Sequence, residues 1–357
     1  MSEEHTFGVE EEFLLVDADG RPAAAAPAVL RDSPEELQPE MVTCQVESVT
    51  PVCEQADELL EHLRAQRAQL VDGARARGLR LLASGTSPVE DTARLTPGER
   101  YRRIADHFRG LMDTVNVCGC HVHVGVPDAS VGVEVLNHLR PWLPVLLALS
   151  ANSPFADGAD TGYASWRYLS MSRWPSGGPP PYVESVAHYE SLVGELAESG
   201  AVLDAANLYW DIRLSPRHPT VEVRVCDVAV TAEEAALLAV LVQGLAASAR
   251  SRIAAGEAAE PVPQEVLRAD LWRAARDGLG GRCADPLTRT LRPAHETLRG
   301  LFDEVRPQLR DGAKEFAEQT VGKVLADGGG AARQRAAFAR RGDLSEVVAF
   351  LAGQTEP

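Results

Sequence analysis

Lysine is almost absent from this chain of 357 residues, which contains only Lys314 and Lys323. Positive charge therefore comes almost wholly from arginine, and the formal net charge is −17 at pH 7. An acidic chain without a lysine-rich patch is poorly suited to nonspecific contact with nucleic acid, so we expect no nucleic-acid partner. An anionic substrate would have to be held by metal ions and by local arginines.

Signals for membranes and secretion are also missing. Residues 1–5 lack the basic and apolar regions of a signal peptide, and no uninterrupted apolar run approaches the ~20 residues that a membrane span needs. The six cysteines are scattered without the spacing of a small disulfide-bonded domain, so we expect reduced thiols. These features predict a cytoplasmic protein with no membrane partner. Its 45% hydrophobic content can form a large core in one or two closely joined domains.

Two common catalytic motifs are absent. The chain has neither the Gly-x-x-x-x-Gly-Lys-Ser/Thr loop that binds nucleotide phosphates nor the Gly-x-Ser-x-Gly motif of a serine nucleophile. Any phosphate would therefore have to be bound by metal and arginine, and any catalysis would proceed without that nucleophile.

Residues 6–17 predict a β-strand that presents two carboxylates on one face. The apolar residues of the opposite face alternate along the strand and are Phe7, Val9, Phe13 and Leu15. Glu10 and Glu12 project side by side from the other face. Like charges this close repel unless a cation lies between them, so the pair indicates a Mg²⁺ or Mn²⁺ site. A solvated acidic strand face is the alternative.

A second strand is predicted over residues 41–51, where Pro51 ends it. Glu47 shares a face with Gln45 and Val49. A single acid on a strand is usually solvated, so this position gains a role only from its context.

Residues 117–126 combine two cysteines with two histidines and at first suggest a zinc site. The strand period argues otherwise, because Cys118 and Cys120 point to one face while His121 and His123 point to the other. One tetrahedral centre cannot collect all four ligands from a regular strand. We therefore predict core cysteines and a histidine pair that faces a site. The alternative is one buried, hydrogen-bonded histidine beside a bystander.

Residues 155–182 form a long segment rich in Gly, Pro, Ser and aromatic residues. Loops of this length in compact domains are usually functional or disordered. Arg167 and Arg173 lie within it beside two tryptophans, and arginine is suited to bidentate binding of carboxylate or phosphate. We predict substrate-binding roles for both. A protein–protein contact patch is the competing interpretation.

Residues 208–228 predict a β-hairpin whose second strand has Glu222 and Arg224 on its polar face. A surface ion pair of little energetic weight is the alternative. Helical periodicity appears in three segments before the hairpin and dominates beyond residue 231. Pro141 and Pro144 kink the third of these segments, residues 131–149. The helical segments are residues 54–77, 98–113, 131–149, 232–255, 264–277, 291–311, 313–326 and 331–352. Strands with ionisable groups followed by helices fit an α+β fold.

Three stretches, taken in order, resemble the signatures of the carboxylate-amine ligases related to glutamate-cysteine ligase, bacterial type 2 group. They are Gly8-Val9-Glu10-Glu11-Glu12-Phe13, Gly119-Cys120-His121-Val122-His123-Val124-Gly125 and Val221-Glu222-Val223-Arg224-Val225-Cys226-Asp227-Val228. The Gln45-Val46-Glu47 segment and the loop from Tyr163 to Pro180 are also similar to that group. The resemblance runs in motif order over nearly the whole chain, and the ordered set is more specific than any single motif.

The resemblance implies a fold and a set of site residues. The fold is an antiparallel β-sheet funnel similar to the glutamine synthetase catalytic domain, flanked by helices. We expect one domain over residues 1–357, with a strand-rich active-site part at about 5–230 and a helical part at about 231–352. The positions that match metal-binding carboxylates are Glu10, Glu12, Glu47 and Glu222. His121 and Arg224 match catalytic positions, while His123 falls where distant relatives have other polar residues and is assigned to substrate binding.

The chemistry implied by the resemblance is ATP-dependent ligation with Mg²⁺ or Mn²⁺. A carboxylate is a poor electrophile, so such ligases first transfer the γ-phosphoryl group of ATP onto it, and an amine then displaces phosphate from the acyl phosphate. We expect the donor to be the side-chain carboxylate of L-glutamate and the acceptor to be the amine of an amino acid, cysteine by default. Another donor, or another small amino acid of specialised metabolism as acceptor, stays open.

Two other functions remain as alternatives at this point. A metal-dependent hydrolase would use His121, His123 and Glu12 around zinc and would turn over without ATP. A metal-stabilised binding protein would hold glutamate or nucleotide without chemistry. The sequence also leaves a homo-oligomer open, because the apolar helix at residues 232–255 could belong to the core or to a subunit interface.

Overall fold

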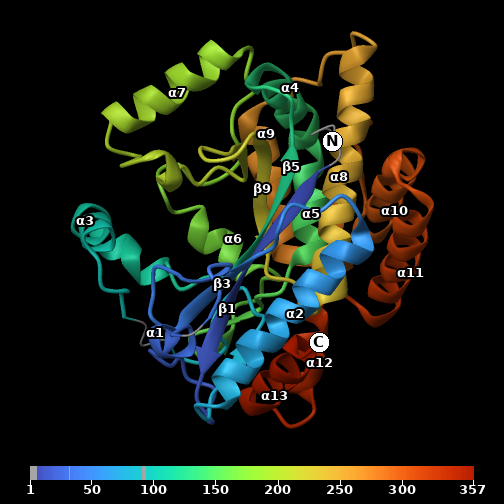
Figure 1. The fold of residues 1–357 in the computed structure, drawn as a ribbon. Helices are drawn as coiled ribbons and strands as arrows, with labels where there is room; N and C mark the ends of the chain where they lie inside the picture. The colour runs from blue at the N-terminus through green and yellow to red at the C-terminus, as the bar shows by residue number, and fades with distance from the viewer. Residues whose placement is uncertain (1–5, 32, 91–93) are drawn as a thin grey trace.

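The alternating segments of the sequence form a seven-stranded antiparallel sheet in a computed structural model that describes residues 6–31, 33–90 and 94–357 (Figure 1). Residues 1–5, on which the expectation of no signal peptide depends, lie outside the described residues. The central strand is β1 (Phe7–Val16), which lies between β3 (Gln45–Val49) and β5 (Gly119–Gly125). The sheet order is β2-β3-β1-β5-β9-β8, and β4 also pairs with β1. The remaining strands are β2 (Leu37–Pro39), β4 (Arg80–Leu82), β8 (Ile212–Leu214) and β9 (Thr220–Asp227).

The strand register gathers the predicted polar positions on neighbouring strands. Glu12 on β1 lies opposite Glu47 on β3, and Glu10 lies opposite His121 on β5. His123 in turn lies opposite Glu222 on β9. Because side chains alternate between the two faces of a sheet, these residues project from the same face. The predicted strands and their faces are therefore confirmed.

A β-bulge interrupts the pairing of β5 with β9. Cys120 pairs with Cys226 and Val122 pairs with Val223, so two residues of β9, Arg224 and Val225, lie opposite the single residue between them on β5. Bulges re-aim side chains and often lie beside functional sites. Here the bulge places Arg224 beside His121.

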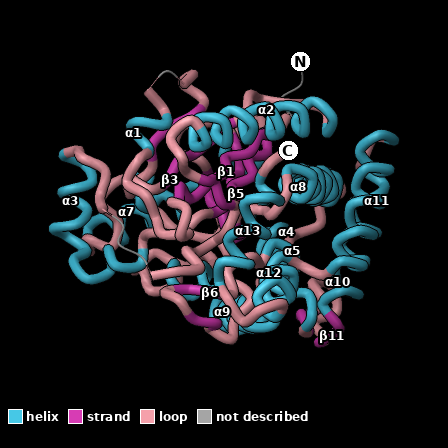
Figure 2. The backbone as a smooth tube through the Cα atoms, turned by 90° about the horizontal axis from the view of Figure 1, so that it is seen from below, coloured by secondary structure: helices cyan, strands magenta, loops and turns pink. Residues whose placement is uncertain are grey.

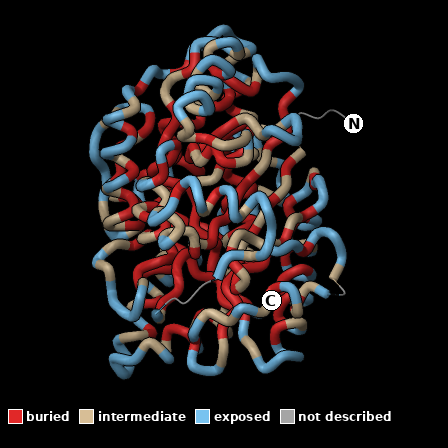
Figure 3. Tube along the Cα trace, turned by 90° about the vertical axis from the view of Figure 1, so that its left-hand side faces the viewer, coloured by how far each residue is buried: buried red, intermediate tan, exposed pale blue. Residues whose placement is uncertain are grey.

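Helices cover the other face of the sheet and form the main core with it. Valines of β1, β5 and β9 pack against α2 (Ala56–Arg75), α4 (Ala129–Leu139), α5 (Leu143–Ser150) and α8 (Ala232–Ala254). The predicted kink is confirmed, because a 3₁₀ turn at Arg140–Trp142 separates α4 from α5. The buried residues concentrate in this interior, and the outer turns of the helices are exposed (Figure 3). All six cysteines are free, as predicted, and all six are buried, including the predicted core residues Cys118 and Cys120.

The α8 helix belongs to this core. It is long and apolar enough to cross a membrane by length and composition, yet 78% of its most apolar window is buried within the protein. It contacts β1 and β5 as well as α2, α4, α10 and α11. The core interpretation of residues 232–255 therefore holds, and the buried part of this helix is not free to form a subunit interface.

A buried ion pair fixes α2 to β1. Glu11 is fully buried on the helix-covered face, where its carboxylate accepts hydrogen bonds from Arg67 Nε at 3.0 Å and Nη2 at 2.6 Å. Arg67 also donates to the carbonyls of Ala229 and Val230. All of the charge of this pair is thus compensated, as burial requires. The sequence pattern alone did not reveal that the middle acid of Glu10-Glu11-Glu12 is part of the core.

Helices α3 (Glu99–Phe108) and α7 (Val186–Glu198) lie on the side of the molecule away from α8 (Figures 1 and 2). The α7 helix packs against α4, and the short helix α6 (Trp166–Met171) contacts β9. The small strands β6 (Phe155–Ala156) and β7 (Ala159–Asp160) pair with each other, and α1 (Ala26–Val29) is a single turn. Residues 155–182 were expected to be a loop, whereas the structure forms α6 within them, and α7 was not predicted.

The C-terminal part is mainly helical, as predicted, with two corrections. The segment 291–311 begins as strand β11 (Leu291–Pro293), which pairs with β10 (Arg282–Ala284), and only then becomes α10 (Ala294–Val305). The segment 331–352 is not one helix, because Gly342 adopts a positive φ of 69° that ends the helical run. It divides into α12 (Gly330–Ala339) and α13 (Leu344–Thr355). The other helices are α9 (Gln264–Asp277) and α11 (Asp311–Asp327).

Candidate active site

A polar pocket lies on the face of the sheet opposite the helical core. Its volume of about 320 Å³ is within the usual range for small-molecule sites. Side chains from β1, β3, β5 and β9 form its floor, and segments around α3 and α6 form its walls. The ionisable residues that line it are Glu10, Glu12, Glu40, Glu47, Arg100, Tyr101, His121, His123, Arg167, Tyr209, Arg213, Arg217, His218, Glu222 and Arg224.

Glu10 lies between the two predicted histidines. One carboxylate oxygen is 3.2 Å from Nδ1 of His121, and the other is 3.3 Å from Nε2 of His123. Burial raises the pKa of Glu10, but the hydrogen bonds and charges of the two histidines outweigh burial and hold this pKa well below its usual range. Burial and the Arg224 guanidinium lower the pKa of His121, so its imidazole is neutral near pH 7 and available as a ligand.

Glu12, Glu40 and Glu47 form an acidic cluster in which three carboxylate oxygens lie within 4.8 Å of one another. Burial, followed by the charge of Glu12, raises the pKa of Glu40 to about 7. Burial and the neighbouring carboxylates also raise the pKa of Glu47 well above its usual value. These raised pKa values indicate that the buried carboxylates of the cluster repel one another when all are ionised. A bound cation would offset this repulsion.

Glu40 was not identified from the sequence. It follows the short strand β2 in an irregular acidic segment, where no hydrophobic period marks one face. Only the pairing of β2 with β3 brings it beside Glu47. A tertiary contact of this kind has no local signal.

Three overlapping groups of pocket side chains have the geometry to hold cations. In each group the possible ligand atoms lie within 4.8 Å of one another. The groups are Glu10 with His123 and Glu222, Glu10 with Glu47 and His121, and Glu12 with Glu40 and Glu47. Carboxylate oxygens with few nitrogen ligands suit Mg²⁺ and Mn²⁺. The donor set and the raised carboxylate pKa values therefore both fit divalent cations.

Two arginines enclose Glu222. Arg213 donates from Nε at 2.8 Å and from Nη2 at 3.3 Å, and Arg224 donates a further hydrogen bond to the same carboxylate. Burial raises the pKa of Glu222, but the charges of Arg224 and then Arg213 outweigh burial and lower it. The structure therefore contradicts the interpretation of Glu222 and Arg224 as a weak surface pair, because Glu222 is only 1% exposed.

The two arginines differ in what else they bind. Nη1 of Arg213 donates to three backbone carbonyls, those of Ala205, Ala206 and Leu208, so all of its hydrogen-bonding groups are used within the protein. Nη1 of Arg224 lies 3.4 Å from Nδ1 of His121, and Arg224 also lines the pocket. Arg213 could not be identified from the sequence because it lies on a three-residue strand too short to show a period.

Of the two arginines assigned to substrate binding, Arg167 lines the pocket and Arg173 does not. Arg167 is buried and donates to the carbonyls of Arg224 and Val225, and its Nη1 is 3.9 Å from the carboxylate of Asp227. Arg173 is exposed and lies over the ring of Trp166, with its guanidinium carbon 5.9 Å from the ring centre. The turn that follows α6 directs Arg173 outward and Trp174 into the pocket. A substrate-binding role for Arg173 is therefore not supported by its position.

An aromatic wall completes the pocket. Trp174 and Tyr209 are in edge contact, with ring centres 5.1 Å apart, and Tyr101, Met41 and Met171 also line this side. The aromatic content of residues 155–182 is visible in the sequence, but it does not identify these positions individually. The wall is apolar while the floor is charged, so the pocket can hold a ligand that has both characters.

The raised carboxylate pKa values predict how metal-free protein responds to pH. The unfolded chain releases the Glu40 proton near the ordinary pKa of 4.5, whereas the folded chain keeps it until about pH 7. Stability is therefore expected to fall as pH rises through this window, and Glu47 acts in the same direction. Excess Mg²⁺ should reverse the loss, because it binds only the ionised carboxylates.

Thermal unfolding with and without Mg²⁺, at about pH 5.5 and about pH 8, measures this effect. We expect the rise in Tm caused by Mg²⁺ to be larger at the higher pH. In a Glu40→Gln variant the difference between the two pH values should shrink. An equal rise at both pH values in the unmodified protein would contradict the prediction.

Comparisons with known proteins cover nearly the whole chain. The model of Glutamate-cysteine ligase family 2 (GCS2) matches residues 6–349. A relative from Rhodococcus jostii (strain RHA1), provisionally named glutamate–cysteine ligase 2-1, is 48% identical over 349 residues, which are 96% of this chain and 95% of the relative. A relative from Nocardia farcinica (strain IFM 10152) with the same provisional name is 46% identical and covers 98% of this chain and 93% of its own length.

Solved structures show the same fold at low sequence identity. The glutamate–cysteine ligase of Francisella tularensis in complex with AMP has a TM-score of 0.72 at 16% identity and covers 98% of this chain and 88% of its own. A bifunctional glutathione synthetase from Pasteurella multocida has a TM-score of 0.73 at 16% identity, over 98% of this chain and 52% of its own. These likenesses and the observed antiparallel sheet with flanking helices confirm the predicted α+β fold class.

Proposed function

The chain belongs to glutamate-cysteine ligase family 2, and from this membership and the pocket we propose that it is an ATP-dependent ligase. It joins the side-chain carboxylate of L-glutamate to the amine of an amino acid, with cysteine as the default acceptor. The observation that carries the proposal is the convergence of Glu10, Glu12, Glu47 and Glu222 with His121 and Arg224 in one pocket. These residues lie in the stretches that resemble the family's signatures.

The proposed reaction has two steps. An oxygen of the glutamate side-chain carboxylate attacks the γ-phosphorus of ATP, the bond to the β-phosphate oxygen breaks, and ADP leaves. The acceptor amine then attacks the acyl carbon, loses a proton and expels phosphate. The product is a γ-glutamyl amide, and the overall balance is the loss of one water from the two amino acids, driven by hydrolysis of ATP to ADP and phosphate.

The carboxylates of the pocket would hold Mg²⁺ or Mn²⁺. Such ions, when bound, would supply positive charge that offsets the negative charge developing during phosphoryl transfer. Glu10, Glu12, Glu47 and Glu222 are the proposed ligands, and Glu40 joins them because of its place in the acidic cluster. His121 contributes a neutral imidazole nitrogen next to Glu10.

Arginines supply the fixed positive charge. Arg224 is the proposed catalytic cation, because it lines the pocket and its charge is held in place by Glu222. Fixed donors directed at developing negative charge stabilise a transition state without the cost of reorganisation. Arg167 and His123 are proposed to bind substrate carboxylate or phosphate, since both line the same pocket.

The proposed partners are small molecules, namely ATP, glutamate and an amino acid. We also propose that the protein is cytoplasmic and acts without nucleic acid or membrane. The strand-rich part and the C-terminal helices are proposed to form one catalytic domain, because α8 packs directly on β1 and β5.

The hydrolase alternative fits the pocket less well. It requires His121, His123 and Glu12 around one zinc ion. Among the described residues, the candidate cation groups place the two histidines in different groups and Glu12 in a third. A nitrogen-rich zinc centre is therefore not assembled.

The decisive measurement is release of ADP from ATP and Mg²⁺ with L-glutamate and a panel of amino-acid acceptors, with mass detection of the products. We expect release that requires both glutamate and one acceptor, and a product lighter than their sum by one water. Release without glutamate would move the donor role to another carboxylate. Absence of ATP turnover with every pair would overturn the ligase proposal and leave a binding function.

A further inference from the structure

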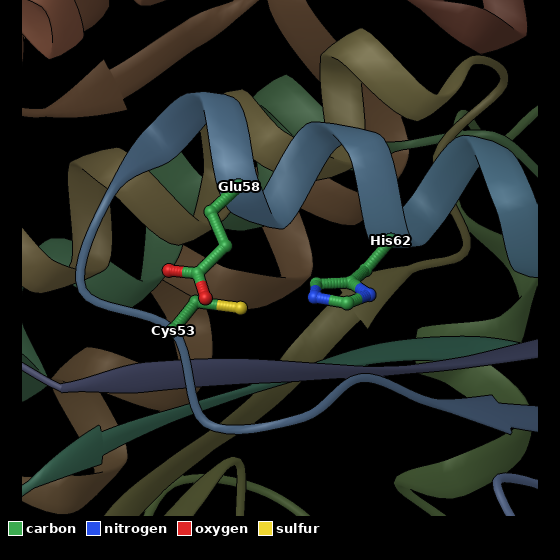
Figure 4. A group of neighbouring side chains, drawn as sticks. All are labelled: Cys53, Glu58 and His62. Carbon is green, nitrogen blue, oxygen red and sulfur yellow. The ribbon is translucent and has the colours of Figure 1, made fainter.

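A fourth group of metal-ligating side chains lies outside the pocket, at the start of α2. Cys53 precedes the helix, and Glu58 and His62 are four residues apart on it. Residues with this spacing project from the same helix face. Figure 4 shows both side chains directed toward Cys53, and the sulfur, one carboxylate oxygen and one imidazole nitrogen lie within 4.8 Å of one another.

We propose that Cys53, Glu58 and His62 form a Zn²⁺ site, with solvent as the fourth ligand. Bonds from zinc to sulfur, nitrogen and oxygen are about 2.0–2.3 Å long, so tetrahedral ligands lie roughly 3.5 Å apart. Small rotations of Glu58 and His62 reach this spacing, because Glu58 is exposed and His62 is half-buried. A mixed set of thiolate, imidazole and carboxylate selects zinc over Mg²⁺, which avoids sulfur.

The cysteine of this site is held rigidly. Its backbone forms two hydrogen bonds with Phe7, at 3.0 Å and 2.9 Å, and its thiol donates to the carbonyl of Pro51 at 3.4 Å. Cys53 is fully buried, and Phe7 is the first residue of β1. A metal ion here would therefore join α2 to the beginning of the strand that carries Glu10 and Glu12.

The site is separate from the pocket. Cys53 packs in the core cluster on the helix-covered face of the sheet, together with Phe7 and Leu59. None of its three ligands lines the pocket. Zinc binding at this position therefore does not depend on the ligase function, and each can fail without the other.

Metal binding at this site must displace a proton. Burial and the neighbouring carboxylate of Glu58 raise the pKa of the Cys53 thiol to about 11, so the thiol is protonated near pH 7 without a metal. Zinc would replace this proton, which passes to solvent as the metal–sulfur bond forms. Affinity should consequently fall about tenfold for each unit that the pH is lowered.

Cobalt titration of the full chain tests the proposal, because Co²⁺ bound to thiolate gives a charge-transfer absorption band. The protein is first stripped of metal and supplied with excess Mg²⁺, so that Mg²⁺ competes with Co²⁺ for the pocket carboxylates. We expect one equivalent of Co²⁺ to produce the band, Zn²⁺ to abolish it, and Tm to rise with Zn²⁺. The Cys53→Ser variant should lose the band, and Glu58→Gln and His62→Ala should weaken Co²⁺ binding by about tenfold or more.

Two matched variants serve as controls. Cys283 is another buried cysteine whose sulfur approaches a proline carbonyl, that of Pro144, and Cys283→Ser should keep the band. Glu61 is an exposed acid on the same helix, and Glu61→Gln should bind Co²⁺ as the unmodified protein does. No thiolate band in the unmodified protein, or a band that survives Cys53→Ser, would overturn the proposal. If Cys53→Ser does not fold, equal affinity in Glu58→Gln and the unmodified protein overturns it instead.

Discussion

Replacing Glu47 with glutamine is expected to lower kcat/KM of the ligase reaction roughly a thousandfold, which corresponds to about 4 kcal/mol of transition-state stabilisation. Glu47 contributes to two of the three candidate cation groups in the pocket, one with Glu10 and His121 and one with Glu12 and Glu40. Its loss therefore weakens two sites at once. Steady-state ADP release at saturating Mg²⁺ measures the change.

The same substitution should stabilise the metal-free protein. Burial and three neighbouring carboxylates raise the pKa of Glu47 well above its usual value, which means that its charge is disfavoured in the folded state. A neutral amide removes that repulsion. The expected combination is a higher Tm without metal and a much lower activity with metal. A residue that only supported the fold would lower both.

Glu36→Gln is the matched control for this test. Glu36 is an exposed acid close to β2 that does not line the pocket, so its loss should leave both activity and Tm nearly unchanged. If Glu47→Gln retained more than about a tenth of the activity, cation binding by Glu47 could not supply the expected several kcal/mol.

The residues of the site that could be predicted from sequence lie on long strands. Over β1, β5 and β9 the two-residue period separates core side chains from pocket side chains, and this period alone puts Glu10, His121 and Glu222 on the polar faces of their strands. The resemblance to the ligase family then groups strands that are far apart in the chain. The two-residue period and the family signatures together are sufficient to predict which residues form the floor of the pocket.

The sequence shows no two-residue period for the residues that form the walls of the pocket. Arg213 lies on a strand of three residues, and Glu40 follows another strand of three, so neither has a period to interpret. Arg173 was assigned to the site because the segment around it was interpreted as a functional loop. The structure forms α6 there, and the turn that follows directs Arg173 to solvent. Side-chain direction in such short elements is decided by tertiary packing.

The sequence pattern also did not reveal that a charged residue, Glu11, lies on the core face of the sheet. Glu11 is one of three consecutive acids, and only its partner Arg67, which is 56 residues away, explains its complete burial. An isolated buried carboxylate would be too costly, so Glu11 can occupy the core face of β1 because Arg67 pairs with it.

Replacing Arg224 with lysine is expected to lower kcat by about 10²–10³-fold, because it removes a fixed donor from the place where negative charge develops. Lysine keeps the charge but loses the planar guanidinium, whose Nη1 contacts both Glu222 and His121 and whose other donors are not bound to either residue. Single-turnover phosphoryl transfer, together with the KM for ATP, measures the effect. The KM should change less than kcat, because the interaction is stronger in the transition state than in the ground state.

Arg213→Lys is the matched comparison, and it should show the opposite balance. Arg213 binds the same carboxylate but uses its remaining donor on three backbone carbonyls, so its loss leaves several buried acceptors unsatisfied. We expect a loss of stability of about 2–3 kcal/mol and a lower Tm, with kcat reduced less than in Arg224→Lys. If Arg213→Lys abolished turnover at unchanged Tm while Arg224→Lys remained active, the two roles would be exchanged. Both guanidinium groups carry the same charge and neutralise the same glutamate, so the distinction depends on their other contacts, which are backbone carbonyls for Arg213 and His121 for Arg224.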